Sequence, residues 1–352
     1  MSLAPDTLTS KGMEVTGTFD DAVEYCYQQG WTDGLPVVPP TEEKVLRFLE
    51  AAGRQPSDVI GVEPVRGRVI SAEKAAIGAV MAGCRPEYVP VIMAALECMV
   101  QPEFNLHGSS ASTGGSAPLL LINGPVRHRL GFASGHNLFG PGPDRRANAT
   151  VGRAIRLILI NVLENHPGVL DRSTLGHPGK YSYCIAEDEE NSPWEPFHVE
   201  RGFDREASTV TVMASLAPCQ IDLVGAGTPE KILSAAADTL VGIGRGHGEI
   251  PLVVGQEHGG IIKRAGWDKA RAREFIFEKA RRTAAEWAAA SKAEAPAPGH
   301  EDDVLPACLS PESVVLLAGG GDGGPWSSLI PRWGKGVGSR SVIREIDTSR
   351  MP

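Results

Sequence analysis

Apolar and polar positions recur along the chain with two periods, one typical of helices and one typical of strands. The segments with helical spacing are preceded by a capping residue or by proline. The residues that start these predicted helices are Thr18, Thr41, Ser71, Pro86, Asn148, Thr228 and Asp268. The helix from about Asn148 is apolar nearly all round, which predicts burial. The helix after Asp268 is predicted to run through KARAREFIFEKARRTAAEWAAA.

Short apolar runs between these helices predict strands. The clearest runs are LLLIN, YSYCIA, STVTVMAS, QIDLVGA, IPLVV and SVVLLA. After Thr228, strands and helices alternate and glycine follows the strands, which is typical of parallel strands covered by helices. The predicted fold class is therefore α/β, with mainly parallel or mixed sheets covered by helices and two packed subdomains.

Changes in composition along the chain predict its domain organisation. Residues 1–17 are polar and aperiodic and are expected to form a mobile N-terminal arm. Residues 18–225 are expected to form a larger α/β domain with loop-rich polar segments, and residues 226–352 a smaller α/β domain. A stretch rich in Ala, Pro and acidic residues near 293–303 has the composition of a surface linker.

Charge and cysteine content exclude several classes of protein. The net charge of −9 over 352 residues would repel a phosphate backbone, so no nucleic-acid partner is expected. There is no apolar run of about 18 residues to suggest a membrane partner, and the first residues lack the features of a signal peptide. A cytoplasmic location is therefore expected. The six cysteines include no C-x-x-C pair, which favours reduced thiols.

A run of small residues, SSASTGGS, leads directly into the predicted strand LLLIN. Its many uncovered backbone N–H groups and its hydroxyls suit an anion or a developing negative charge. The alternative is a tight turn that needs small residues for packing. The run is not a P-loop, because the required lysine and following helix are missing. The substrate-binding residues predicted here are Ser112, Thr113, Gly114 and Ser116.

The loop GHNLFGPGPDRRANAT precedes the buried helix. Two arginines at a helix N-terminus carry the charge that the helix dipole disfavours, and an acidic ligand would explain them. The alternative is that they meet a carboxylate or another group elsewhere in the fold. Asn148 is expected to cap the helix. The substrate-binding residues predicted in this loop are His136, Asn137, Arg145, Arg146 and Asn148.

A third polar segment contains the predicted catalytic residues His198, Glu200 and Cys184. On an extended segment, His198 and Glu200 would point to the same face and could act as a base with its orienting carboxylate. Cys184 is a candidate nucleophile that would need a neighbouring cation. The alternative is a structural hydrogen-bond network. The spacing does not match a zinc motif, so the metal content stays open.

Glu257 and His258 directly follow the predicted strand IPLVV, and GGGDGG follows SVVLLA. In open α/β sheets the carboxyl ends of strands face the ligand crevice, so both residues are further catalytic candidates. The alternative is turn chemistry. The glycine run lacks the G-x-G-x-x-G pattern, and no motif in the chain requires a cofactor.

Several long phrases resemble a recurrent bacterial family associated with UGSC-type (seleno)proteins. They are WTDGLPVVPPT, HGSSASTGGSAPLLLINGP, FGPGPDRRANATVGRAIR, GKYSYC, PWEPFHVERGF and VVLLAGGGDGG. The resemblance spans nearly the whole chain after the arm. It implies a bacterial metabolic setting and a thiol- or selenol-bearing partner protein, and it implies no activity or catalytic residues. The UGSC motif itself is absent, so a redox role is not carried over.

Polar loops at strand and helix ends exceed what stability requires, which favours an enzyme. The expected substrate is a small anionic organic molecule, and the expected chemistry is acid–base or nucleophilic, by hydrolysis, hydration or lyase-type cleavage. The chain is expected to form a homo-oligomer or a hetero-oligomer. One alternative function is a subunit that forms its active site only with a thiol- or selenol-bearing partner protein. Another is a non-catalytic binding protein. The hypothesis requires the polar loops to converge on one pocket.

Overall fold

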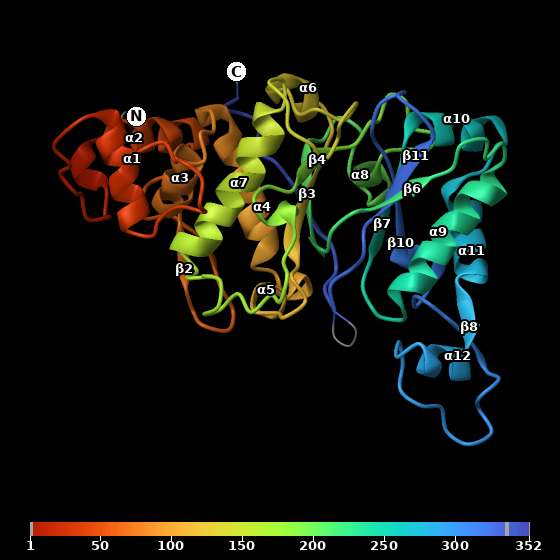
Figure 1. The fold of residues 1–352 in the computed structure, drawn as a ribbon. Coiled ribbons are helices and arrows are strands. Elements are labelled where there is room, and N and C mark those ends of the chain that lie inside the picture. The colour runs from red at the N-terminus through yellow and green to blue at the C-terminus, as the bar shows by residue number, and fades with distance from the viewer. Residues whose placement is uncertain (1–2, 335–337, 352) are drawn as a thin grey trace.

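Two four-stranded sheets form the centre of the molecule, and helices cover their outer faces (Figure 1). The computed structural model describes residues 3–334 and 338–351. The first sheet has the order β12-β5-β3-β4, with bounds Val342–Glu345, Thr209–Ser215, Ala117–Asn123 and Cys184–Ala186. The second has the order β10-β7-β11-β6, with bounds Val314–Ala318, Ile250–Val254, Trp326–Leu329 and Cys219–Asp222.

Most helices lie outside these sheets, and two short hairpins extend from the body of the protein. On the N-terminal side the helices are α1 Phe19–Gln28, α2 Glu42–Ala52, α3 Ala72–Met81, α4 Val89–Met99, α5 Leu106–Ser110, α6 Val126–Leu130 and α7 Arg146–Asn161. The later helices are α8 Phe197–Glu200, α9 Pro229–Ile243, α10 Gln256–Arg264, α11 Lys269–Lys279 and α12 Ala284–Ala289. The hairpins pair β1 Val59–Val62 with β2 Val69–Ser71, and β8 Arg281–Thr283 with β9 Val304–Pro306.

An apolar layer joins the two sheets face to face. Leu119 and Leu121 of β3 share one buried cluster with Val253 of β7 and Leu317 of β10. Side chains alternate between the two faces of a strand. The intervening residue Leu120 therefore points away from this layer, into the core formed with α2, α3, α4 and α7. A third core lies between the second sheet and α9, α10 and α11. The layers are thus helix, sheet, sheet and helix.

Local capping signals fold as predicted. The side chains of Thr18, Thr41 and Ser71 each accept a hydrogen bond from a backbone N–H in the first turn of α1, α2 and α3. Gly53 ends α2 in the left-handed conformation, with φ of 64°. These signals act within a few residues of the chain, so they do not depend on the rest of the fold.

The α/β class with mixed sheets is confirmed, since only β3–β4 and β7–β10 among the neighbouring strands of the two sheets are parallel. Two sequence-based expectations about elements need correction. The helix expected through KARAREFIFEKARRTAAEWAAA ends at Lys279, because the next residues pair as β8 with β9. Asn148 lies inside α7 and does not cap it, since the helix already begins at Arg146.

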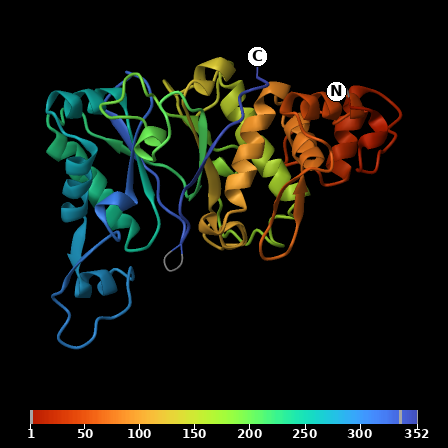
Figure 2. The same cartoon turned by 180° about the vertical axis from the view of Figure 1, so that it is seen from behind.

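Sheet membership does not follow the boundary predicted near Gly225. β6 lies before Gly225 but belongs to the second sheet, whereas β12 lies near the C-terminus and belongs to the first. Figure 2 shows the C-terminal segment, in blue, returning to the first sheet, where β12 pairs with β5. The predicted linker at 293–303 is a loop between α12 and β9.

The N-terminal arm is tied to the helices and does not project freely. Both carboxylate oxygens of the buried Glu73 accept hydrogen bonds from Thr9 and Ser10 of the arm, at 2.7–2.8 Å. The backbone of Leu3 donates to Glu50 at 3.0 Å. The described part of the arm therefore has defined contacts at Leu3, Thr9 and Ser10. All six cysteines are free thiols. Over the described residues, every helix is too short or too polar to cross a membrane.

Candidate functional site

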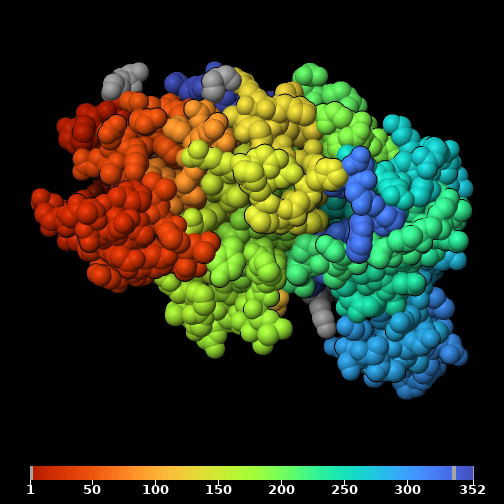
Figure 3. Space-filling model, turned by 45° about the horizontal axis from the view of Figure 1, so that its top comes forward, coloured from red at the N-terminus to blue at the C-terminus, as the bar shows by residue number. Residues whose placement is uncertain are grey.

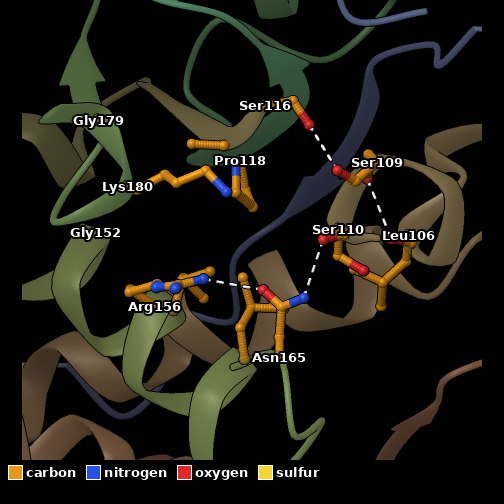
Figure 4. Close-up of a pocket in the computed structure, with 13 residues that line it drawn as sticks. Leu106, Ser109, Ser110, Ser116, Pro118, Gly152, Arg156, Asn165, Gly179 and Lys180 are labelled. Atoms are coloured by element: carbon orange, nitrogen blue, oxygen red, sulfur yellow. Dashed lines mark hydrogen bonds between the residues drawn. The ribbon is translucent and has the colours of Figure 1, made fainter. Parts of the chain in front are cut away.

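A narrow cavity lies between the end of α5, the middle of α7 and the segment that ends at Lys180 (Figure 4). Its empty volume is about 430 Å³, including the part that opens to solvent. The space in which the centre of a water molecule fits is only about 20 Å³, so about one water-sized group enters fully. The polar lining consists of Ser109, Ser110, Ser116, Arg156, Asn165 and Lys180.

Glycines bring the walls of this cavity together. A Cβ at Gly152 of α7 would lie 2.4 Å from Ser182 Oγ and 2.7 Å from the backbone nitrogen of Tyr183. Only glycine therefore lets α7 approach the chain that enters β4, and Arg156 follows one turn later on the same face. Likewise, a Cβ at Gly115 would lie 3.1 Å from the backbone of Gly176, so the two loops meet at paired glycines.

Two cations in this cavity share one buried carboxylate. Lys180 Nζ donates to Asp171 Oδ2 at 2.6 Å and to Ser173 Oγ at 2.8 Å. Arg156 Nη2 lies 3.4 Å from the same Asp171 oxygen, and its Nη1 donates to Asn165 Oδ1 at 2.9 Å. The Asp171 side chain is only 4% exposed, and those of Arg156 and Lys180 are 12% and 17% exposed. Two positive charges thus share one negative charge at a site with little access to water, which favours the binding of an anion.

Burial changes the protonation chemistry of this cluster. It lowers the pKa of the Lys180 ammonium, and the charge of Arg156 adds to this effect against the opposing influence of Asp171. Burial opposes ionisation of Asp171, but hydrogen bonds from Lys180 and Ser173 outweigh it and lower the pKa of that carboxyl. Lys180 is therefore an ammonium group that gives up a proton more readily than an exposed lysine.

The serines face the cations from the opposite wall (Figure 4). Their hydroxyl protons are already used: Ser116 Oγ donates to the carbonyl of Ser109 at 2.8 Å, and Ser109 and Ser110 donate to carbonyls one turn earlier. These hydroxyls shape the cavity, and Arg156 and Lys180 supply its charge.

Of the predicted residues in SSASTGGS, Ser116 lines the cavity and the other three do not. Ser112 Oγ accepts hydrogen bonds from Trp333 Nε1 at 2.7 Å and from the backbone of Gly114 at 2.9 Å. The carbonyl of Thr113 accepts one from Thr174 at 3.0 Å. Loop packing therefore accounts for Ser112, Thr113 and Gly114, as the alternative interpretation proposed.

The predicted residues around the start of α7 lie away from this cavity. Arg145 bonds the carbonyl of His136 and pairs with Asp144, and Arg146 donates to the carbonyl of Gly83 at 3.0 and 3.2 Å. The arginine pair is thus satisfied within the fold, without an acidic ligand. The Asn148 side chain instead links the backbone of Ala133 to that of Cys184 in β4, at 2.9–3.2 Å.

His136 and Asn137 lie in an exposed loop beside the glycine loop that follows β10. His136 Nε2 is 2.9 Å from Asp322 Oδ1, and the backbone of Gly320 donates to Ser134 at 2.8 Å. Figure 3 shows these loops next to each other on the surface, in yellow and blue. GGGDGG therefore packs against the loop that contains His136. A side chain at Gly321 would collide with His136.

The proposed pairing of His198 with Glu200 is wrong. The segment is helical, in α8, so residues two apart do not share a face. Glu200 pairs with Lys269 at 2.5 Å and with Arg273 at 2.6 Å, both in α11. His198 is fully buried, and its Nε2 donates to the carbonyl of Arg205 at 3.2 Å.

The contacts of the remaining catalytic candidates, Cys184, His258 and Glu257, do not form a catalytic arrangement. Burial raises the pKa of the Cys184 thiol, with a smaller contribution from Cys84, which disfavours the nucleophilic thiolate. Burial lowers the pKa of His258, whose Nδ1 lies 2.8 Å from Ser327 Oγ. Glu257 is exposed at the start of α10. The structure therefore brings none of these residues to the cavity described above.

A second buried polar cluster lies at the carboxyl ends of β3 and β4. Asn123 Nδ2 donates to Glu187 Oε2 at 2.6 Å and to Glu189 Oε1 at 3.0 Å, and Arg127 pairs with Glu189 at 3.0 Å. His198 Nδ1 is 3.9 Å from Glu189. Burial raises the pKa of Glu187 to about 7. Within the described residues, Asn123 Oδ1, Glu187 Oε1 and His198 Nδ1 have no hydrogen-bond partner.

Sequence reasoning named none of Arg156, Asn165, Asp171 and Lys180 as a site residue. One signal was available: Arg156 is, with Arg153, one of two charged residues in the otherwise apolar stretch from Val151 to Ile160. The cluster around Glu187 had a signal too, because EDEE follows the buried strand YSYCIA directly. Neither signal identifies a site until the fold shows which other segments lie next to these residues.

No protein-family model, curated protein or solved structure matches the chain. Among the described residues, His, Cys, Asp and Glu side chains form no group of three or more that could hold a metal ion. The candidate site therefore rests on its own geometry.

Proposed function

We propose that the chain is an enzyme that binds the acid group of a small organic anion between Arg156 and Lys180 and acts on it by acid–base chemistry. The observation that supports this most directly is that both cations share the single carboxylate of Asp171. A carboxylate ligand would restore neutrality in a site where water is largely excluded. In the hydrolysis, hydration and lyase-type reactions considered above, this pair of cations would hold the acid group of an anionic substrate.

Each residue of the cluster has a distinct role in this proposal. Arg156, held by Asn165, keeps the acid group in place. Lys180 has three ammonium protons and uses two in its bonds to Asp171 and Ser173, so one remains for the ligand. Its lowered pKa suits the transfer of that proton to negative charge that develops on the substrate. Asp171 orients the ammonium group and takes no proton itself.

Binding of the acid group is tested first, by isothermal titration of the purified chain with acetate, glycolate, malonate and pyruvate. At least one of these anions should bind saturably. Arg156→Gln and Lys180→Met should each weaken binding by about tenfold, since each removes a charged hydrogen bond. Lys231→Met, at an exposed position of α9, is the control and should bind normally. Unchanged affinity in both cavity variants would contradict the proposal.

Turnover is tested separately, by NMR in D2O. Water or hydroxide takes a C–H proton next to the acid group, and Lys180 stabilises the negative charge that this leaves on the substrate. The neighbouring C–H protons of pyruvate or malonate should therefore exchange for deuterium from the solvent faster than in buffer. Lys180→Met should return the exchange rate to that of buffer. Arg156→Gln should slow the exchange at low anion concentration, because it weakens binding.

A second candidate function is a binding protein for a carboxylate-sized anion. The small space of about 20 Å³ favours it, because only about one water-sized group, such as one oxygen of an acid group, enters fully. Saturable binding without any deuterium exchange would identify this function. The alternative in which a partner protein completes the site predicts a third result in the same assay. Deuterium exchange would then appear only when a thiol- or selenol-bearing protein is added. The resemblance to the UGSC-associated family stays a prediction.

A further inference from the structure

A second cavity lies on the side of α7 away from the anion cavity, which is the one at Arg156 and Lys180. It is enclosed by the arm between residues 8 and 15, by α1, α2 and α3, and by the C-terminal half of α7, and its volume is about 580 Å³. Pockets for small organic molecules typically measure about 300–1,000 Å³. The two cavities share no lining residue, so they are separate candidate sites.

The walls of this second cavity are mainly apolar. Ile77 and Met81 of α3 line it together with Ile158 of α7. Tyr25 and Trp31 add two aromatic rings, packed edge to face with centroids 5.8 Å apart. Such walls favour an alkyl chain or a ring over a mainly polar ligand.

The arm adds two large apolar side chains that water contacts. Met13 and Val15 both line the cavity, and they are 49% and 37% exposed. Exposed apolar side chains that gather at a groove with a polar rim are typical of a ligand-binding site. An apolar ligand in the cavity would remove part of this surface from water.

The charges on the lining balance each other. Lys11 and Lys74 carry two positive charges, and Glu42 and Glu73 carry two negative charges. Burial opposes ionisation of Glu73, but hydrogen bonds from the arm outweigh it and lower the pKa of this carboxyl. A balanced lining supplies no counter-charge to an ionised ligand, and removing an ion from water is costly. The lining therefore favours a neutral ligand.

We propose that this cavity binds a neutral amphiphile, such as a medium-chain alcohol, with its alkyl chain against α3 and α7. The hydroxyl group lies at the edge of the cavity, where Lys11, Glu42 and Lys74 are exposed. A hydroxyl group both donates and accepts hydrogen bonds, so it suits an edge that offers ammonium groups and a carboxylate together. A carboxylate ligand only accepts and an ammonium ligand only donates, so each would face like charges there.

The charge of the ligand is tested by isothermal titration of the full chain at pH 7 with octanol, octanoate and octylamine. The three share one alkyl chain, but octanoate is an anion and octylamine a cation at this pH. Octanol should bind saturably and at least about tenfold more tightly than either ion, because the ions lose hydration without a matching counter-charge. The proposal is overturned if octanol does not bind, or if either ion binds as tightly as octanol.

The location of the ligand is tested by filling the cavity. Ala22→Trp places an indole on its wall and should weaken octanol binding by about tenfold or more. The matched control is Ala288→Trp, at a similarly half-buried position of α12, which should bind octanol like the wild type. Normal octanol binding by Ala22→Trp would place the ligand elsewhere and overturn the proposal.

A milder variant tests the contribution of the arm. Val15→Ser removes apolar surface from the lining and should weaken octanol binding several-fold. Val224→Ser is the control, because Val224 is 82% exposed and lies outside the lining. Arg156→Gln should also bind octanol normally, which separates this site from the anion cavity. Wild-type affinity in Val15→Ser, or lost binding in Arg156→Gln, would contradict the proposal. Circular dichroism confirms that each variant is folded.

Discussion

Lys180 is half-buried and Glu187 is buried, and the charge of each is compensated to a different degree. Lys180 has a carboxylate at 2.6 Å, so its ammonium form is compensated. Glu187 accepts hydrogen bonds from Asn123 and from the backbone of Phe197, at 2.6 and 2.8 Å, and these only partly offset its burial. The protonation of Glu187 should therefore control stability near neutral pH, and the charge balance at Asp171 should control stability at the anion cavity.

The Glu187→Gln variant should lose a pH dependence that the wild type has. The pKa of Glu187 is raised from its ordinary 4.5 to about 7 in the fold, so the folded state binds more protons than the unfolded state between these values. The stability from this group is fully present below about pH 4.5 and is lost as pH rises through about 7, a change of about 3 kcal/mol. Urea unfolding at pH 5 and pH 8 measures this change.

Glutamine keeps the shape of Glu187 and cannot ionise. The loss of stability between pH 5 and pH 8 should therefore be smaller in the variant than in the wild type, with the benefit of the variant confined to high pH. Equal pH dependence in both proteins would mean that Glu187 is already ionised in the fold at pH 5.

The Asp171→Asn variant should be destabilised at pH 7 by about 3 kcal/mol, because Arg156 and Lys180 then lack their carboxylate. Thermal unfolding measures the effect, with Asp238→Asn at an exposed position of α9 as the control. An anion that binds the cavity should raise the melting temperature of Asp171→Asn more than that of the wild type. Equal stabilisation of both proteins by acetate or malonate would argue against an anion between the two cations.

At the scale of elements, close approach between helices is set by small residues. α3 crosses α7 at Gly78, where a Cβ would lie 2.5 Å from Ile158 Cγ1. Gly78 and Ile158 also line the second cavity of about 580 Å³, on the side of α7 away from the anion cavity. The spacing of α3 and α7 therefore affects the shape of that cavity.

Gly78→Ala should destabilise the protein by about 1–3 kcal/mol, because the added methyl group overpacks this crossing. Gly242→Ala is the matched control, since a Cβ at this position of α9 meets nothing within 4 Å. It should stabilise the protein by up to about 1 kcal/mol through higher helix propensity. Chemical denaturation of both variants measures the difference, and a stabilised Gly78→Ala would show that the helices separate without cost.

At the scale of the whole molecule, the layer between the two sheets should make unfolding cooperative. The layer takes residues from both sheets, and β12 carries the C-terminal segment back to the first sheet. Loss of either sheet would expose the apolar face of the other. One unfolding transition is therefore expected for the full chain.

Leu317→Ala should test this coupling. Leu317 is 1% exposed in the shared layer, so its truncation should cost about 2–5 kcal/mol and lower the midpoint of a single transition. Leu309→Ala is the control, because Leu309 is 59% exposed, and it should change stability by less than about 0.5 kcal/mol. Far-UV circular dichroism and tryptophan fluorescence should give coincident curves. Two separate transitions would contradict the coupling.

The sequence by itself determined the features that act over a few residues. The caps at Thr18, Thr41 and Ser71 and the stop at Gly53 form as predicted, because a side chain and the backbone that it bonds are adjacent in the chain. The α/β class followed from the same local periodicity. The helix predicted beyond Lys279 failed because its residues gain strand partners from β9, more than twenty residues later.

Only the tertiary structure decided which polar residues meet. Part of SSASTGGS lines the candidate cavity, but its hydroxyls donate to the chain itself, and the charged residues of the cavity come from α7 and the loop before β4. Arg145, His198 and Thr113 lie in three different surroundings, because helical geometry and the packing of two sheets place them apart. Charge compensation in a folded protein depends on the distances between charged atoms. For segments far apart in the chain, the residue spacing in the sequence does not determine these distances.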